Sequence, residues 1–383
     1  MPPVEVNLSV QVFDPVSVWS TADVNNPVTA VMRDASGSDA QWVSGTACVV
    51  WAAADPSYLN GREFVAPGET LAPPPVYVRS ATLRINDQIV RSYPEDYRPS
   101  STDTGVELEV MFDSTHFPND TPIKIEVECH DSLGRSYKTH RTFRTYNKAL
   151  VLGNQTFGDD AQNSVLAVES AASGVNYDVT HSFQDNVATI LGELPRYTAF
   201  YIDSHGGVGN LTDCFGDGIN EDDVFGQVEV SSALKAKSPT YPPYNFAMFD
   251  ACIVMGDKFD NPDTADNAGM SSAFELAAGT DRAALGWDWY TLSDDANVQW
   301  TERLWGYLVE GVPLRDAATL SSAGGDAEGA VHPPFYPSLV YRYTSINPVI
   351  QGDSNMTLHG VYGGTTWDFD NGFLPVSTWY RPL

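Results

Sequence analysis

The pattern of apolar residues changes once along this chain, near residue 147, and this change constrains the fold more than any other feature. Before it, several segments alternate apolar and polar residues with period 2, which is typical of half-buried strands. These segments are VEVNLSVQVF, ATLRINDQIV, VELEVMF, IKIEVECHD and SYKTHRTFRT, with NDTP and DSLG as turn formers. Residues 1–146 are therefore predicted to form an all-β, immunoglobulin-like sandwich domain.

After residue 147, apolar runs alternate with helical stretches. This alternation predicts a mostly parallel sheet with helices on both faces, and hence a second, α/β domain over residues 147–383. A length of 383 residues is consistent with two domains. Strands are expected near 148–153, 177–183, 198–204, 245–251 and 282–287, and helices near 162–173, 186–194, 230–236, 270–278 and 294–320.

Two of the central apolar runs end in reactive side chains. AFYI is followed by Asp203, Ser204 and His205, and FAMF is followed by Asp250, Ala251 and Cys252. Sites in parallel sheets form beyond the carboxyl ends of the strands, so His205 and Cys252 would meet if the two strands are neighbours. A thiol assisted by an imidazole is a nucleophile with its general acid/base.

The next residue, Gly206, lets the backbone turn sharply after the histidine. Its N–H and that of Cys252 are candidates for an oxyanion hole. The competing interpretation is a buried core thiol beside an unrelated histidine. Spacing alone leaves both interpretations open.

Along the chain, an apolar block that ends in His-Gly is followed by a second apolar block that leads into FDACIVMG. This order resembles that of the caspase-like cysteine peptidases, and most of all the clostripain-like and gingipain-like group. The resemblance covers about 147–383 and implies that His205 is the general acid/base and Cys252 the nucleophile. It implies a caspase-like fold for the α/β domain. Attack by a thiol assisted by a histidine requires no cofactor.

Other assignments fit the sequence less well. A papain-like order needs a histidine after the cysteine, and His332 or His359 would serve, but Cys252 lacks the sequence that surrounds papain-like nucleophiles. The segment TLHG, which contains His359, is interpreted as a late strand end. Cys214 lies in a polar, glycine-rich loop and is a poor nucleophile candidate.

The acids near these strand ends suggest a preference for basic substrates. Asp250 shares the side of Cys252 in an extended segment, and a carboxylate beside a thiol raises the pKa of the thiol, so substrate binding is the better role for this acid. Asp288 follows the next strand, between Trp287 and Trp289. The resemblance implies cleavage after Arg or Lys, with Asp250 and Asp288 binding the basic side chain and Trp287 or Trp289 as pocket wall. A capping or surface role for Asp288 fits equally well.

Further acids gather in two loops. A Ca²⁺ site there is an alternative to a solvated acidic surface, which we prefer because neither loop has the EF-hand register. The members are Asp213, Asp217, Asp222 and Asp223 in one loop and Asp257, Asp260, Asp263 and Asp266 in the other.

The net charge of −29 disfavours nucleic acid and anionic membranes as partners. It favours basic peptides or divalent cations, or adaptation to high salt. No stretch is long and apolar enough to span a bilayer, and no signal peptide is visible, although we expect a secreted or cell-surface protein. Cys48 and Cys129 are candidates either for a disulfide or for two buried thiols. The oligomeric state is not indicated.

Together these features predict a two-domain cysteine endopeptidase that acts on peptides or proteins through an acyl-enzyme. The alternative is an inactive surface-binding or adhesion protein with a decayed peptidase domain.

Overall fold

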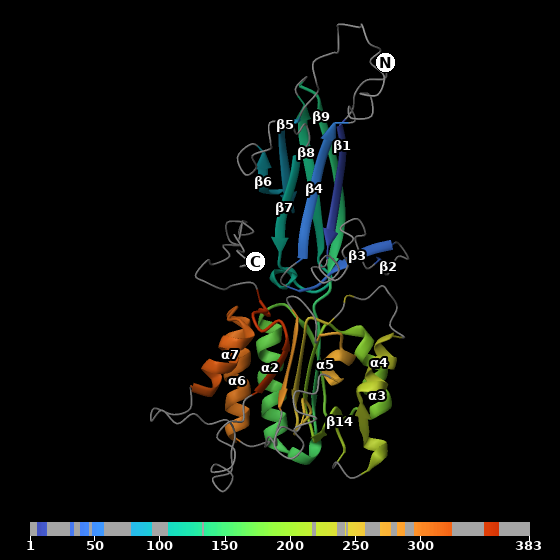
Figure 1. Ribbon diagram of the computed structural model, residues 1–383, viewed down its shortest axis with the longest axis vertical. Helices are drawn as coiled ribbons and strands as arrows, with labels where there is room; N and C mark the ends of the chain where they lie inside the picture. Colours follow the sequence, from blue (N-terminus) through green and yellow to red (C-terminus); the bar gives the residue numbers. More distant parts are fainter. Residues whose placement is uncertain are drawn as a thin grey trace.

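The computed structural model describes two lobes stacked along the long axis of the molecule (Figure 1). The described residues are 6–13, 31–33, 39–45, 48–56, 78–93, 106–131, 134–216, 220–235, 242, 244–256, 269–276, 282–287, 295–323 and 348–359. The predictions for Asp288, Trp289, the acids 217, 257, 260, 263 and 266, and His332 lie outside these ranges.

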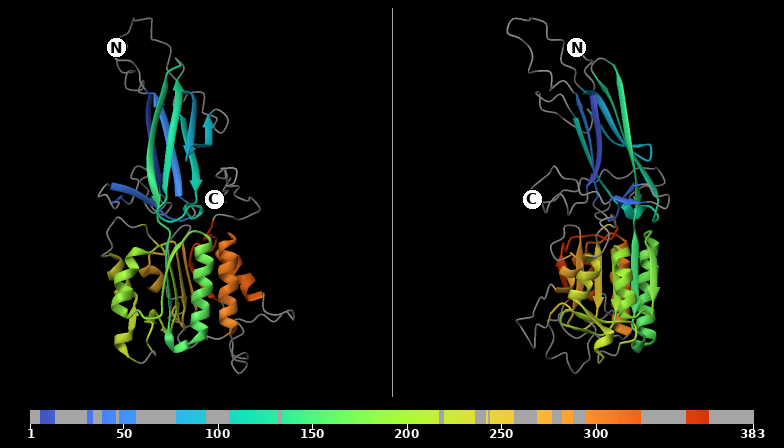
Figure 2. Two further views of the ribbon diagram at one scale, coloured as in Figure 1. Left: turned by 180° about the vertical axis from the view of Figure 1, so that it is seen from behind. Right: turned by 90° about the vertical axis from the view of Figure 1, so that its right-hand side faces the viewer.

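The first lobe contains two sheets that lie side by side in both views of Figure 2. One is an antiparallel sheet of β1 (Val6–Phe13), β4 (Cys48–Pro56) and β7 (Val106–Phe112), in that order. The other has six strands and is antiparallel except between β3 and β9. Its order is β2 (Val31–Arg33), β3 (Asp39–Val43), β9 (Ser136–Thr145), β8 (Pro122–Asp131), β5 (Val78–Ile85) and β6 (Gln88–Tyr93).

The alternating segment ATLRINDQIV spans a hairpin and is not a single strand. Asn86 and Asp87 connect β5 to β6 with φ values of 47° and 68°. Two consecutive residues at positive φ make the kind of tight turn that matches the twist of antiparallel strands, and Asn and Asp tolerate this conformation better than other non-glycine residues.

A buried carboxylate lies in the middle of β8. The Glu126 side chain is only 3% exposed, and its oxygens lie 2.7 Å from Lys138 Nζ and 2.9 Å from Lys124 Nζ. The hydrogen bond from Lys138 lowers the pKa of Glu126 below its ordinary value, and the bond from Lys124 adds to this, although burial acts in the opposite direction.

The second lobe is built on a six-stranded sheet in which the first five strands are parallel and the last is antiparallel. The prediction of a mostly parallel sheet is therefore confirmed. The order is β11 (Asp178–Ser182), β10 (Lys148–Gly153), β12 (Ala199–Asp203), β16 (Phe246–Asp250), β17 (Ala283–Trp287) and β18 (Pro348–Gly352). A smaller sheet of β13 (Gly206–Gly207), β14 (Asn210–Thr212) and β15 (Val224–Gly226) follows β12.

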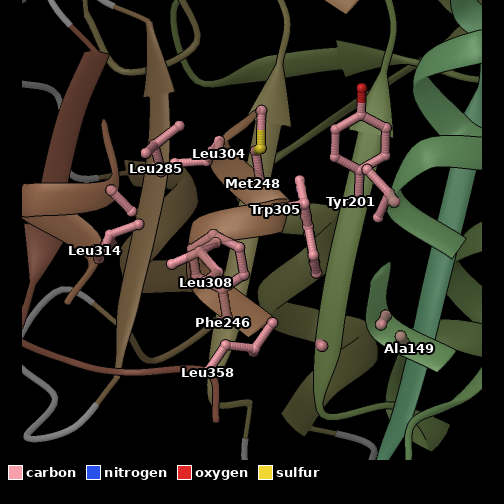
Figure 3. Packing of buried hydrophobic residues seen from close by; sticks show 14 of the residues in the cluster. Ala149, Tyr201, Phe246, Met248, Leu285, Leu304, Trp305, Leu308, Leu314 and Leu358 are labelled. Atoms are coloured by element: carbon pink, nitrogen blue, oxygen red, sulfur yellow. The ribbon is translucent and has the colours of Figure 1, made fainter. Parts of the chain in front are cut away.

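Helices cover both faces of the large sheet, on opposite sides in Figure 1. One face carries α2 (Asp159–Gly174), α6 (Asp295–Val309) and α7 (Leu314–Ala323). The other carries α3 (Val187–Glu193), the 3₁₀ turn η4 (Leu194–Arg196), α4 (Gln227–Lys235) and α5 (Gly269–Ala273). Figure 3 shows Tyr201, Phe246 and Met248 of the sheet with Leu304, Trp305 and Leu308 of α6. The central strands are continuously apolar because both of their faces are buried.

The prediction of one long helix near 294–320 is wrong, because two helices occupy this region. Gly311 has a φ of 80°, and the N–H of Val312 donates to the carbonyl of Tyr307 at 3.0 Å. This is a Schellman-type end for α6, and Pro313 directly precedes the first residue of α7. The interpretation of TLHG as a strand end is also wrong, since β18 ends at Gly352 and His359 lies in a bend beyond it.

Only Tyr146 and Asn147 separate β9 of the first lobe from β10 of the second. Asn147 is fully buried, and its side chain donates to the carbonyls of Ser114 at 2.9 Å and Phe117 at 3.2 Å. The Ser114 hydroxyl donates to the Asn147 Oδ1 at 2.8 Å. These bonds fix the connection between the lobes. Across the described residues, no helix combines the length and the apolar character that crossing a membrane requires.

Candidate active site

The register of the sheet brings the predicted histidine and cysteine to the same edge. β12 and β16 are adjacent and parallel, and their last paired residues are Asp203 and Asp250. One further backbone bond follows, from Ser204 N–H to the Asp250 carbonyl at 3.1 Å. His205 and Cys252 each lie two residues beyond the last pair, and both are partly exposed. The condition that the two strands are neighbours is therefore met. Their carboxyl ends lie at the edge of the lobe farthest from the first lobe (Figure 1).

Gly206 lies against the backbone of the cysteine. A Cβ at this position would be 2.7 Å from the Cys252 carbonyl oxygen and 3.2 Å from its nitrogen. Cβ atoms do not approach backbone atoms so closely, so glycine allows the two strand ends to come together. This contact independently shows that the segments carrying His205 and Cys252 are adjacent.

A short relay of hydrogen bonds fixes the imidazole of His205. Its Nε2 lies 3.1 Å from the Thr156 Oγ1, and Thr156 lies 2.5 Å from the Oδ1 of Asn154. The amide nitrogen of Asn154 donates to the carbonyls of Asp213 at 2.8 Å and Gly216 at 2.7 Å, so its Oδ1 is the acceptor.

The single hydroxyl hydrogen of Thr156 is thus directed at Asn154. We therefore assign the proton of neutral His205 to Nε2, as donor to Thr156, which leaves Nδ1 as the basic atom. Proton transfer with a thiol uses such a basic ring nitrogen.

The same edge includes residues that follow β10. The ring of Phe157 lies 4.5 Å from that of His205, and Asn154 and Thr156 belong to the same short turn. β10 is flanked by β11 on one side and β12 on the other, so the strand order reverses there. Crevices of parallel sheets form at such switch points. The sequence reasoning missed these three residues, although NQTF comes directly after the predicted strand 148–153 and the same rule would have found it.

The backbone after the cysteine is strained. Ile253 has a φ of 46°, a conformation that is rare for a β-branched residue. Two backbone bonds hold this turn: Met255 N–H donates to the Trp287 carbonyl at 3.0 Å, and Gly209 N–H donates to the Val254 carbonyl at 3.2 Å. Strain of this kind persists only where the surrounding structure enforces it, and it is concentrated at functional sites.

Asp250 lies in the core, below the edge. Asp250 is 1% exposed, and its carboxylate accepts hydrogen bonds from four buried or partly buried side chains. These are Trp287 Nε1 at 3.1 Å, Asn297 Nδ2 at 2.9 Å, Tyr201 Oη at 3.2 Å and Thr301 Oγ1 at 3.3 Å. Burial raises the pKa of Asp250 to about 6 despite these donors.

This geometry gives Asp250 and Trp287 a structural connection that the sequence reasoning did not anticipate. The indole of Trp287 is also 1% exposed and donates to Asp250, so it is part of the core between the sheet and α6. A basic substrate side chain could bind Asp250 only by displacing this set of donors. The carboxylate therefore anchors α6 to the end of β16.

The remaining predicted groups have distinct surroundings. Cys214 is buried, and burial raises the pKa of its thiol to about 12, which agrees with its dismissal as a nucleophile. Asp213 is also buried, and it accepts bonds from the N–H groups of Phe215, Gly216 and Val187. These bonds account for the burial of Asp213 without a Ca²⁺ ion.

The two cysteines of the first lobe lie in different sheets. Cys48 begins β4, and Cys129 is buried in β8 of the other sheet.

Comparisons with known proteins add no functional information. No protein-family model and no curated protein matches the chain. Among solved structures, the superoxide reductase (neelaredoxin) from Ignicoccus hospitalis is similar over 27% of this chain and 73% of that chain, with 7% identity and a TM-score of 0.17.

A 2,6-sialyltransferase from a Photobacterium species has 7% identity and a TM-score of 0.17 over 48% of this chain and 38% of that chain. A sialyltransferase from Photobacterium damsela has 9% identity and a TM-score of 0.15 over 59% of this chain and 40% of that chain. The chain thus spans less than half of either sialyltransferase, and TM-scores this low support no argument. The class that the fold itself defines is a mixed α/β protein with a mostly parallel six-stranded sheet and a separate, mainly antiparallel β lobe.

Proposed function

We propose that this protein is a cysteine endopeptidase with Cys252 as the nucleophile and His205 as the general acid/base. The observation that carries the proposal is the pairing of β12 with β16, which ends at Asp203 and Asp250 and leaves His205 and Cys252 at equivalent positions of one sheet edge. The close approach of Gly206 to Cys252 supports it as well.

In this mechanism the Cys252 thiolate attacks the scissile carbonyl carbon, after its proton has passed to Nδ1 of His205. The N–H groups of Gly206 and Cys252 would donate to the resulting oxyanion. The imidazolium then protonates the departing amine, which leaves an acyl-enzyme. His205 finally takes a proton from water, whose oxygen attacks the acyl carbon and releases the thiol.

The caspase-like fold for residues 147–383 and the immunoglobulin-like sandwich for residues 1–146 are part of the proposal. The mostly parallel sheet with helices on both faces is compatible with the first, and the two neighbouring β-sheets are compatible with the second. The resemblance around His205 and Cys252 is what selects the caspase-like group.

Cleavage after Arg or Lys is the expected specificity. With Asp250 engaged by four donors, this expectation now depends on Asp288 and on the strongly negative chain. Kinetics with matched fluorogenic peptides that carry Arg, Lys, Asn or Asp at P1 provide the test. A higher kcat/KM for Asn or Asp would refute the basic preference and leave the peptidase proposal intact.

The peptidase proposal itself is tested by covalent labelling. A basic acyloxymethyl ketone should label the wild type and Cys214→Ala but not Cys252→Ala, with and without added Ca²⁺. Cys214→Ala is the matched control because its thiol is buried and its pKa is high. A protein that is neither labelled nor able to cleave Arg and Lys peptides would instead be the inactive surface-binding protein.

Thr156 is proposed as a positioning residue that orients His205. Thr156→Val removes the acceptor for Nε2, so the imidazole loses its fixed tautomer and orientation. We expect kcat to fall about tenfold or more and the acidic limb of the pH–rate profile to move, with recovery in Thr156→Ser. An unchanged pH profile in Thr156→Val would show that the relay has no role in catalysis.

A further inference from the structure

One cluster of metal-ligating side chains lies at the junction of the two lobes, far from the candidate active site. Among the described residues, Asp113, His116 and His359 each direct one ligand atom into a common space, and these atoms all lie within 4.8 Å of one another. Asp113 follows β7 in the first lobe, and His116 ends the 3₁₀ turn η2 (Ser114–His116). His359 comes from the segment after β18 in the second lobe, so the cluster joins parts of the chain that are distant in sequence.

We propose that Asp113, His116 and His359 bind a divalent transition-metal ion of the Zn²⁺ class. Two imidazoles and one carboxylate form a ligand set that suits such ions, with water completing the coordination. Magnesium and calcium are not expected, because they prefer sites composed of oxygen atoms.

The spacing of the ligand atoms fits an ion between them. The Asp113 Oδ2 lies 3.2 Å from the His116 Nε2 and 3.9 Å from the His359 Nδ1. Ligands about 2.1 Å from a tetrahedral zinc ion are separated from one another by roughly 3.4 Å, and the two observed distances bracket this value. The centroids of the two imidazole rings lie 4.2 Å apart, and the ring planes are tilted by 44°.

The carboxylate is already oriented by groups around the site. The Asp113 Oδ1 accepts bonds from the N–H of Thr115 at 2.8 Å and from its hydroxyl at 2.7 Å. These two donors leave Oδ2 directed at the histidines. Such supporting bonds orient ligands and strengthen metal binding.

The burial of the cluster also suits a resident ion. Asp113 is 1% exposed, and the side chains of His116 and His359 are 6% and 15% exposed. Partial access through His359 gives the ion an entry path. Binding at Nδ1 of His359 would replace its contact with the Thr115 hydroxyl, which lies 2.8 Å away.

An ion here would link the two lobes through residues that are widely separated in the chain. Thr115 and His359, which meet at this cluster, are 244 positions apart. A link of this span restricts the unfolded chain strongly, and metal affinity contributes directly to the stability of the folded form.

The test is zinc binding by the full chain in a Cys252→Ala background, which removes this partly exposed thiol as a competing ligand. The protein is first treated with EDTA and gel-filtered. Titration calorimetry should then show that one equivalent of Zn²⁺ binds with a micromolar or lower dissociation constant. His116→Gln and His359→Gln should each weaken binding at least tenfold. His140→Gln, an exposed histidine on β9, is the matched control and should bind as the parent does.

Two further readouts separate metal binding from general effects on folding. Bound Co²⁺ should give visible absorption bands of a low-coordinate site that are lost in His359→Gln, and Zn²⁺ should raise the melting temperature of the parent but not of that variant. Circular dichroism establishes that the variants are folded. Absence of binding to the parent, or equal binding by the parent and both folded variants, would overturn the proposal and leave the cluster as a hydrogen-bonded network.

Discussion

The buried carboxylate of Asp250 makes a specific prediction about stability and pH. Burial raises the pKa of Asp250 from 3.8 to about 6 in the folded protein. The folded form therefore holds a proton over a pH range in which the unfolded chain has lost it. A group whose pKa is raised by folding contributes stability that is complete below the unfolded pKa and is lost as the pH rises through the folded pKa.

The magnitude follows from the shift. A difference of about two pKa units corresponds to on the order of 3 kcal/mol in the free energy of unfolding. About four-fifths of this contribution should be present at pH 4, just above the unfolded pKa of 3.8, and it should be absent above pH 7. Asparagine has the same shape as aspartate but does not titrate, so Asp250→Asn lacks this pH dependence. The new amide among the four donors changes the free energy of unfolding by an amount that does not vary with pH.

Urea unfolding of the wild type and Asp250→Asn between pH 4 and pH 7.5 measures the effect. The free energy of unfolding of the wild type minus that of the variant should fall with rising pH by about four-fifths of the amount given above. Taking the difference removes the titration of the other acids. A difference that is flat, or that rises with pH, would refute the reasoning from burial.

Three other predictions test the packing around the site and the first lobe. Gly206→Ala should destabilise the protein by about 1–3 kcal/mol and lower peptidase activity, because the added methyl would lie 2.7 Å from a backbone oxygen. Gly207→Ala, which meets no described atom within 4 Å, should change neither property, and urea unfolding with a peptide assay compares the two. Trp305→Ala should reduce the free energy of unfolding by about 3–5 kcal/mol, because the indole is 1% exposed in the core, and a loss below 1 kcal/mol would contradict that packing. Glu126→Gln should destabilise the protein at neutral pH and progressively less in acid. The reason is that Lys138 lowers the pKa of Glu126, and the resulting stability is lost as the pH falls through that pKa. Equal losses in the free energy of unfolding at pH 7 and pH 3 would contradict this prediction.

The strands were predictable where burial dictates their composition. The runs at 148–153, 199–202 and 246–249 are apolar because both faces of the central sheet are covered, and they coincide with β10, β12 and β16. The same regularity predicted that His205 and Cys252 share an edge. Such features follow from the spacing of apolar residues and from the order of strands and helices along the chain, and both can be seen in a single sequence.

Other features depend on partners that pattern does not reveal. Asp250 has the same spacing from Cys252 whether its carboxylate faces a cleft or the core, and only the arrival of α6 with Asn297 and Thr301 decides between the two. Gly311 and Pro313 are typical of a helix end and are visible in the sequence, although the prediction placed a single helix across them. The contact of His359 with Asp113 joins distant segments and has no local signal.

The two-residue connection between β9 and β10 has a mechanical consequence. β10 continues away from the first lobe along the direction in which β9 enters the junction (Figure 1). Tension applied to the first lobe would therefore be transmitted along β10, which is hydrogen-bonded to β11 on one side and β12 on the other. Because these bonds run across the strands, such a load acts on them in shear, and many must break together before the strand can slide. A load on the first lobe would thus reach the second lobe along β10, while the edge that carries His205 and Cys252 lies at the opposite end.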